Sequence, residues 1–352
     1  MLAAEPARST AGILMAMCQW LPVAVVAAAL GATACDTPGS KCVSCPTAPT
    51  EIVLPAGTLA FHASPVPLDV IAWITPLGNL NPPGHAVPTD HIYFYLANPD
   101  AGQSPQPGRA LFFAPSDGTV TAVFGGTGQE SKLYVRVTQT MAYYLDHLIL
   151  DSGISVGTKL TSGQRVGVTG AAYAVDLGVV NMALTRTGLL NFSRYTDEDI
   201  HADAPLRYFD EPLRSQLYAK VQRIGGDLDG RNDYDIAGRL VGNWFVEGGG
   251  TPVSFAYNTY DPSQVRICVG GVIGSPIVWG IAPGDPLPRD VSVSTGMVRY
   301  TLTQARTGLP LGDSPSAQLL VQMTGESRIQ AEVVPSLKPA TEFSSAARFL
   351  IR

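Results

Sequence analysis

The stretch YYLDHLILDSGISVGTKLTSGQRVGVTG, residues 143–170, carries the pattern that decides the fold. Its apolar residues form short runs, and Gly157 and Gly163 interrupt them where the chain must turn sharply. Glycine at such points supplies the positive φ or the close backbone approach that a tight turn needs. The stretch therefore predicts short β-strands joined by tight turns.

Similar alternating runs, split by Gly, Pro and Asn, occur on both sides of this stretch. Those before it include HIYFYLA (91–97), GTVTAVFG (118–125) and KLYVRVT (132–138). Towards the other end there are about seven or eight more, enough for a closed antiparallel barrel or a sandwich. We expect a mainly β protein, with a first β domain at residues 56–193 and a second, antiparallel one at residues 227–352.

The most charged part of the chain, residues 194–226, interrupts this β pattern. Apolar residues recur there at helical spacing, from Leu213 to Ile224. The pattern predicts one helix, over roughly residues 211–223, within a helical bridge between the two β domains.

Residues 1–34 have the form of an export signal. Arg8 precedes a long apolar run, and Ala32-Thr33-Ala34 fits the small-residue cleavage rule. Cys35 follows at once, as in a bacterial lipobox, so we expect lipidation of Cys35, with simple secretion or an uncleaved anchor as alternatives. Each of these places the mature chain in the bacterial cell envelope, either as a membrane-anchored lipoprotein or as a periplasmic or extracellular protein.

Residues 35–55 form a linker rich in Pro, Ser and Thr that contains Cys42 and Cys45. In an exported protein such a pair predicts a small local disulfide. A redox site of the thioredoxin type needs a strand before the pair and a helix after it, and neither pattern is present. Cys268 lies in an apolar run, so we expect it to be a buried free thiol.

Composition excludes two function classes. The 352 residues carry a net charge of -6, and only 15% are charged. With no basic stripe to neutralise phosphates, nucleic acid is not an expected partner. The 36 Gly and 28 Pro residues follow no period, which excludes collagen and predicts many turns.

Two histidines and an aspartate follow a proline-rich turn in NPPGHAVPTDHIYFYL, residues 81–96. His85, Asp90 and His91 are of the types that bind zinc. Adjacent residues of a strand point to opposite faces, so Asp90 and His91 are not expected to reach one metal ion. Simpler roles are a turn histidine bonded to backbone for His85 and a turn cap for Asp90.

A further histidine, His147, lies in the opening stretch. We expect His91 and His147 to form a buried polar pair lined by Tyr93, Tyr95, Tyr143 and Tyr144. Such a cluster can hold a ligand, whereas ordinary core packing is the simpler explanation. The candidate binding cleft consists of His85, Asp90, His91, Tyr93, Tyr95, Tyr144 and His147.

The order of these segments resembles the duplicated hybrid motif of the lysostaphin-type zinc endopeptidases, which cut peptidoglycan cross-bridges. APSDGTV at 114–120 matches the family's APxDGxV turn and strand. YLDHL at 144–148 matches its Tyr-x-His-Leu strand end with one extra residue, and residues 156–170 match its VGxxVxxGQxxGxxG segment. The resemblance covers about residues 75–185. It implies a duplicated-hybrid-motif, lysostaphin-peptidase-like β barrel or sandwich, followed by the helix and a second antiparallel β barrel or sandwich.

The same resemblance implies a zinc ion held by an H-x3-D motif and by the last histidine of an H-x-H motif. His91 takes the place of the first histidine, but Tyr95 stands where the aspartate belongs. Residues 173–179, YAVDLGV, stand where H-x-H belongs. His147 matches the family's catalytic histidine that does not bind the metal. A catalytic zinc needs three protein ligands and an open position, and only His91 is carried over.

We therefore expect a degenerate, non-catalytic peptidase-like domain, a pseudoenzyme without a cofactor, that binds peptidoglycan, a glycan or an envelope protein. The first alternative is an active zinc endopeptidase of peptidoglycan. In that case His85, Asp90 and His91 would be the metal ligands, Asp176 a substitute ligand, and His147 the catalytic residue.

Two weaker patterns occur near the second β domain. DLDGRNDYD, residues 227–235, alternates carboxylates before a glycine as a calcium loop does, but it lacks the later bidentate acid and the flanking helices. An Asp-rich turn is the simpler prediction. Gly242-Asn243-Trp244 resembles the Gly-x-Trp of the first lipocalin strand. A second alternative function is therefore a lipocalin-like carrier of an apolar ligand, although a core tryptophan explains the tripeptide equally well.

Overall fold

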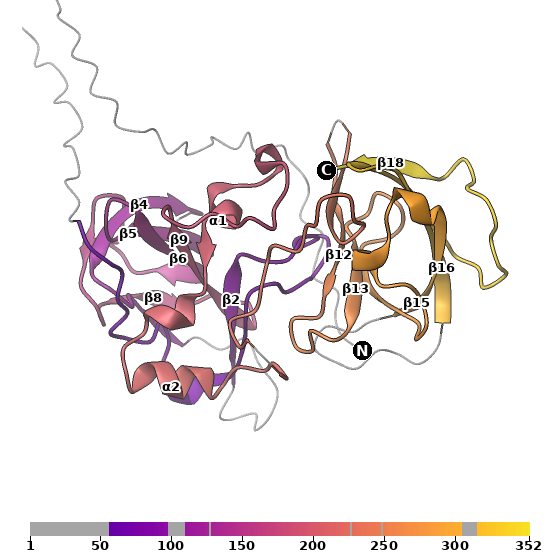
Figure 1. Ribbon diagram of the computed structural model, residues 1–352. Helices are drawn as coiled ribbons and strands as arrows, with labels where there is room; N and C mark the ends of the chain where they lie inside the picture. Colours follow the sequence, from indigo (N-terminus) through magenta and orange to yellow (C-terminus); the bar gives the residue numbers. More distant parts are fainter. Residues whose placement is uncertain (1–55, 98–109, 127, 226, 248, 305–314) are drawn as a thin grey trace, which may run out of the picture. The chain divides into compact units, whose positions relative to one another are not determined.

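The computed structural model describes residues 56–97, 110–126, 128–225, 227–247, 249–304 and 315–352 (Figure 1). The described residues all belong to one compact unit. The export signal, Cys35, and the linker with Cys42 and Cys45 lie outside the described residues and stay predictions. Among the described residues, no helix has the length and apolar character that a membrane span requires.

Ten strands form the first sheet, and all the pairings between them are antiparallel. They are β1 (Ile71–Thr75), β2 (His91–Leu96), β3 (Leu111–Phe113), β4 (Gly118–Phe124), β5 (Ser131–Arg136), β6 (Met141–Leu150), β7 (Lys159–Leu160), β8 (Arg165–Thr169), β9 (Ala174–Asn181) and β10 (Ala202–Asp203). Their order is β1-β2-β9-β6-β5-β4-β7, while β10 pairs with β9, and β8 pairs with β3 and β6. The central trio β2, β9 and β6 positions the candidate site.

Alternation along the strands builds the core of this sheet. In β5 every second residue is buried, and Leu133 and Val135 are fully so. β2, β6 and β9 add Phe94, Leu145 and Leu177 to the same cluster. The period of two that predicted strands therefore sets one face of the sheet against the apolar core.

Glycines make the turns predicted from the opening stretch. Gly157 has φ +91° and Gly163 has φ +78°, on either side of the short strand β7. Both values lie in the left-handed region that glycine adopts without a steric penalty.

The helical region contains two short α-helices, α1 (Asp197–Ile200) and α2 (Leu213–Tyr218). The predicted helix over residues 211–223 is therefore too long. After α2 the chain pairs with β1 instead, where Ile74 N donates to Lys220 O and Gln222 N donates to Ile74 O. The other helical elements are 3-10 turns at Leu68–Val70, Phe192–Arg194, Pro205–Tyr208, Pro288–Asp290 and Val293–Thr295.

Eight strands form a closed barrel, which decides between the barrel and the sandwich expected for this part of the chain. They are β11 (Gly242–Val246), β12 (Val253–Tyr257), β13 (Val265–Val269), β14 (Ile277–Ile281), β15 (Met297–Gln304), β16 (Pro315–Gly325), β17 (Arg328–Val334) and β18 (Arg348–Ile351). Each strand pairs antiparallel with the next, and β18 closes the barrel on β11. Both sheets lie within one compact unit, so independent folding of residues 56–193 and 227–352 stays a prediction.

Side chains fill the barrel. Trp244, Phe255, Tyr300 and Leu319 are 0% exposed, so no water-sized space adjoins these four described residues. Trp244, from the Gly-x-Trp tripeptide, is a core residue, and the Arg352 guanidinium lies 4.1 Å from its ring centroid. Cys268 is a buried free thiol, as predicted.

The carboxylates of residues 227–235 have separate partners. Asp229 accepts from Arg207 Nε, Asp233 accepts from the backbone N–H of Gly188, and Asp235 accepts from that of Asn243. The segment is therefore an Asp-rich turn whose carboxylates fix neighbouring backbone.

Candidate functional site

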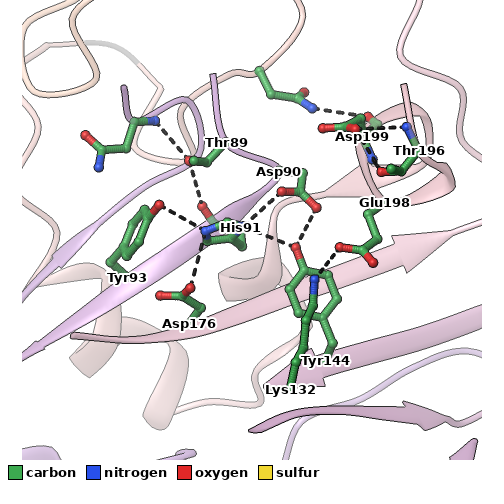
Figure 2. A network of polar contacts seen from close by, with 12 residues as sticks. Thr89, Asp90, His91, Tyr93, Lys132, Tyr144, Asp176, Thr196, Glu198 and Asp199 are labelled. Carbon is green, nitrogen blue, oxygen red and sulfur yellow. Dashed lines mark hydrogen bonds and ion pairs between the residues drawn. The ribbon is translucent and has the colours of Figure 1, made fainter. Parts of the chain in front are cut away.

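A cluster of polar side chains lies where β2, β9 and β6 run side by side (Figure 2). Strand register brings its members together: His91 pairs with Gly178 and Tyr93 with Asp176. On the other side of β9, Tyr144 pairs with Gly178 and Asp146 with Asp176. Asp176 and Gly178 are two residues apart, so they share one face at the centre of the site.

His91 is buried, and polar atoms surround both of its ring nitrogens. Nδ1 lies 2.9 Å from Asp90 Oδ1, and Nε2 lies 3.0 Å from the Tyr93 hydroxyl and 3.4 Å from Asp176 Oδ2. Burial alone lowers the pKa of His91, but the charges of Asp176 and Asp90 outweigh it and raise the pKa to about 9. Near neutral pH His91 is therefore an imidazolium that donates from both nitrogens and has no lone pair for a metal.

The contact between Asp90 and His91 corrects the expectation that the two side chains diverge. β2 begins at His91, so Asp90 lies in the turn before it and strand alternation does not apply. The Asp90 carboxylate is buried, which raises its pKa, but His91 more than offsets this and holds the pKa well below its usual range. Asp90 and His91 thus form a buried ion pair.

Tyr144 closes this ion pair from the β6 side. Its hydroxyl donates to Asp90 Oδ2 over 2.5 Å, and its ring lies across the backbone of β9. A Cβ on Gly178 would lie 2.0 Å from Tyr144 Cζ, so the ring occupies the place of any side chain there. The Tyr144 ring, from β6, therefore fills the space that a side chain at position 178 of β9 would take.

Lys132 covers the outer side of Tyr144, with Nζ 4.0 Å from the ring centroid. Helix α1 holds this lysine, because Glu198 Oε2 lies 2.5 Å from Lys132 Nζ. A capping box between Thr196 and Asp199 fixes the start of α1 (Figure 2). Burial, together with the charge of Asp90, raises the pKa of Asp199 to about 7.

Asp176 joins the two histidines that were expected to pair. Its Oδ2 lies 3.4 Å from His91 Nε2 and 3.5 Å from His147 Nε2. The other nitrogen of His147, Nδ1, lies 3.2 Å from Glu130 Oε2. His91 and His147 are thus parts of one cluster, but a carboxylate mediates their contact.

Two of the residues predicted to line a cleft, His85 and Tyr95, lie at the edge of this polar cluster. The ring of His85 lies 5.3 Å from that of His91, and its backbone bonds to Asn81 in both directions, as expected of a turn histidine. Burial and the neighbouring charge of His91 lower the pKa of His85 to about 4. Tyr95 stacks on Trp73, with ring centroids 4.7 Å apart.

The zinc site that the resemblance implies does not fit the residues present. His91 is protonated, Tyr95 stacks on an indole, and Gly178 has no side chain. Among the described residues, the group of three whose ligand atoms lie within 4.8 Å of one another is Asp146, His147 and Asp176. Of these, His147 is the catalytic residue and Asp176 the substitute ligand expected for the peptidase alternative.

Asp146, Glu130 and Lys132 are the site residues that sequence reasoning missed. The extra residue in YLDHL was the available signal for Asp146. Glu130 directly precedes β5 and Lys132 is its second residue; the alternating pattern predicts this strand but does not indicate what the polar side chains contact.

No protein-family model matches the chain, and no curated protein matches it. Among solved structures, Csd3 from Helicobacter pylori matches with 16% identity and a TM-score of 0.26, over 35% of this chain and 30% of Csd3. A zinc containing peptidase from Vibrio cholerae matches with 18% identity and a TM-score of 0.27, over 35% of this chain and 37% of its own. Lysostaphin matches with 11% identity and a TM-score of 0.25, over 66% of this chain and 90% of its own. This chain thus spans less than two thirds of the first two proteins, and the likeness to all three is partial.

Proposed function

We propose that the protein is a non-catalytic binding protein of the bacterial cell envelope, whose peptidase-like sheet engages peptidoglycan, a glycan or a partner protein. Export and lipidation at Cys35 belong to this proposal and rest on the sequence of residues 1–35.

The observation that carries the proposal is the position of Tyr144. Its ring takes the space beside Gly178, and its hydroxyl bonds the carboxylate of Asp90. A hydrolytic zinc needs three ligands and an open position for water. Here β9 contributes no side chain at Gly178, and His91, the one metal-binding histidine that the resemblance carries over, is an imidazolium held by carboxylates.

Charge supports the same reading. The ion pair of His91 with Asp90 is buried, and Tyr93, Tyr144 and Asp176 complete its hydrogen bonds. A buried charge is stable only when it is paired in this way, so the pair stabilises the sheet in the form observed. Recruiting His91 to a metal would break that pairing and leave Asp90 buried without its partner.

The experiment combines binding and hydrolysis on insoluble peptidoglycan. The full chain, produced in a bacterial host, is sedimented with purified cell walls, and soluble fragments are measured with and without added zinc. We expect cosedimentation and no fragment release. Zinc-dependent release of fragments that disappears in His91→Ala would establish the peptidase alternative, and absence of the chain from the pellet would exclude peptidoglycan as the ligand.

A further inference from the structure

A β-bulge in β6 puts two neighbouring side chains into one place. Leu145 pairs with Leu133 and Leu148 pairs with Ser131, so β6 takes three steps where β5 takes two. His147, inside the bulge, has φ +65°. In a regular strand Asp146 and His147 would point to opposite faces, whereas a bulge re-aims a side chain. Ligand atoms of both residues lie within 4.8 Å of each other and of Asp176.

Two carboxylates face each other across the strand pair at this point. Asp146 on β6 and Asp176 on β9 are direct partners in the antiparallel register. Like charges directly opposite one another destabilise a sheet, and a cation between them removes that cost. The bulge adds an imidazole beside the two carboxylates.

The imidazole is oriented as a metal ligand is. His147 Nδ1 lies 3.2 Å from Glu130 Oε2, which leaves Nε2 on the side of Asp176. Glu130 is itself fixed, because its Oε1 accepts from the backbone N–H of Ala171. A carboxylate behind a histidine is the usual outer shell of a bound metal.

One separation can be compared directly with metal geometry. His147 Nε2 and Asp176 Oδ2 are 3.5 Å apart. Two ligands of a tetrahedral zinc, each at 2.0–2.1 Å, lie about 3.3–3.4 Å from each other. The two atoms are thus already close to the spacing that a shared ion requires.

An unsatisfied atom points independently to a ligand. Asp176 is 3% exposed, and its Oδ1 has no hydrogen-bond partner among the described residues. A buried carboxylate oxygen without a partner is costly, and a cation is the partner it lacks. The His147 side chain is 36% exposed, so an ion can enter from solvent.

We propose that Asp146, His147 and Asp176 bind one divalent transition-metal ion of the zinc class. An imidazole with two carboxylates suits zinc or manganese, whereas calcium takes oxygen ligands alone. The site differs from the one the resemblance implies, because it uses the extra residue of β6 and the position of the family's non-ligand histidine. It also goes beyond the proposed function, since metal binding is measured without cell wall.

The test is a calorimetric titration of chelator-treated full chain with Zn²⁺, with the visible spectrum of the Co²⁺ form as a second readout. We expect one ion per chain and a Co²⁺ spectrum of low coordination number. Asp146→Asn and His147→Asn should each weaken binding at least tenfold. Glu130→Gln should weaken it by about 10–100-fold through the outer shell. His62→Asn, an exposed histidine paired with Asp210 and outside the cluster, is the matched control and should bind as the unmodified chain does.

Circular dichroism is the check that each variant is folded. Asp146 and His147 are only half-buried, so both substitutions should be tolerated. Absence of saturable Zn²⁺ binding by the unmodified chain overturns the site. Unchanged affinity in both Asp146→Asn and His147→Asn also overturns it. Neither result bears on cosedimentation with cell walls, so failure of the cation site and failure of the proposed function are distinguishable.

Discussion

Tyr144 and Gly178 are direct partners on β6 and β9, and the tyrosine ring occupies the space that a Cβ on the glycine would need. Because Gly178 has no side chain, the Tyr144 ring can extend across β9 to Asp90.

Substituting Gly178→Ala should destabilise the protein by about 1–3 kcal/mol, because the new methyl overlaps a fully buried ring. Chemical denaturation measures the change. Gly84→Ala is the control, since Gly84 has open space around it and should stay within about 0.5 kcal/mol. In the double variant with Tyr144→Ala the cost should fall below the sum of the two single costs. Strict additivity would show that the ring is not the obstacle.

Two adjacent tyrosines allow a matched comparison of hydrogen bonds. Tyr144 donates to the charged carboxylate of Asp90, and Tyr143 donates to the neutral carbonyl of Ser116. Tyr144→Phe should cost about 1.5–3 kcal/mol and Tyr143→Phe about 0.5–1.5 kcal/mol of unfolding free energy. Equal costs would mean that Asp90 is not ionised in the folded protein.

The His91 ion pair predicts a loss of stability at alkaline pH. Its pKa rises from about 6.5 in the unfolded chain to about 9 in the folded one, so the folded state binds the proton more tightly. The stabilisation is complete below pH 6.5 and is lost as the pH rises through 9. This difference corresponds to about 3 kcal/mol.

Denaturation curves between pH 6 and pH 10 measure this effect. His91→Gln should flatten the fall in stability. A slope that remains below about pH 7 includes Asp199, and above it includes His147, whose pKa burial lowers but Asp176 raises more strongly. His85→Gln is the control, because a pKa of about 4 keeps His85 neutral throughout this range. The idea fails if His91→Gln retains the full slope.

Arg352 should be a major stabilising residue of the barrel. Its guanidinium donates to the carbonyls of Ile236, Arg239 and Val241 and covers the Trp244 ring. Arg352→Ala leaves these acceptors without their donor and should cost about 3–5 kcal/mol. Tryptophan emission during denaturation reports the change. Arg348→Ala, at an exposed arginine that begins β18, the strand directly before Arg352, should cost less than about 1 kcal/mol.

Much of the fold was predictable because strands leave a local signature. Alternation marked β2, β4, β5 and β8, and glycine marked the turns on either side of β7. β14 was harder to find, since IVWGI is short and most of its residues are only half-buried. Helix α2 was overestimated because apolar spacing continues to Ile224, which is 65% exposed and lies outside the core.

The sequence predicted which residues belong to the candidate site better than it predicted how they contact one another. His85, Asp90, His91, Tyr93, Tyr144 and His147 do gather in one region, since they lie on β2, β6 and the turn before β2. Which atoms touch depends on register between strands far apart in sequence, which no local pattern encodes. The bridging position of Asp176 and the support from Glu130 come from that register.

The bulge at His147 has a consequence for how such a sheet can diversify. β6 absorbs its additional residue within two positions of β5, while its pairing with β9 continues without a shift from Met141 to Asp146. A single inserted codon can therefore change which polar side chains β6 presents at one place, while the pairing of the sheet is unchanged. Deleting Asp146 would return the strand to an even pleat, a smaller genetic step than rebuilding a ligand set residue by residue.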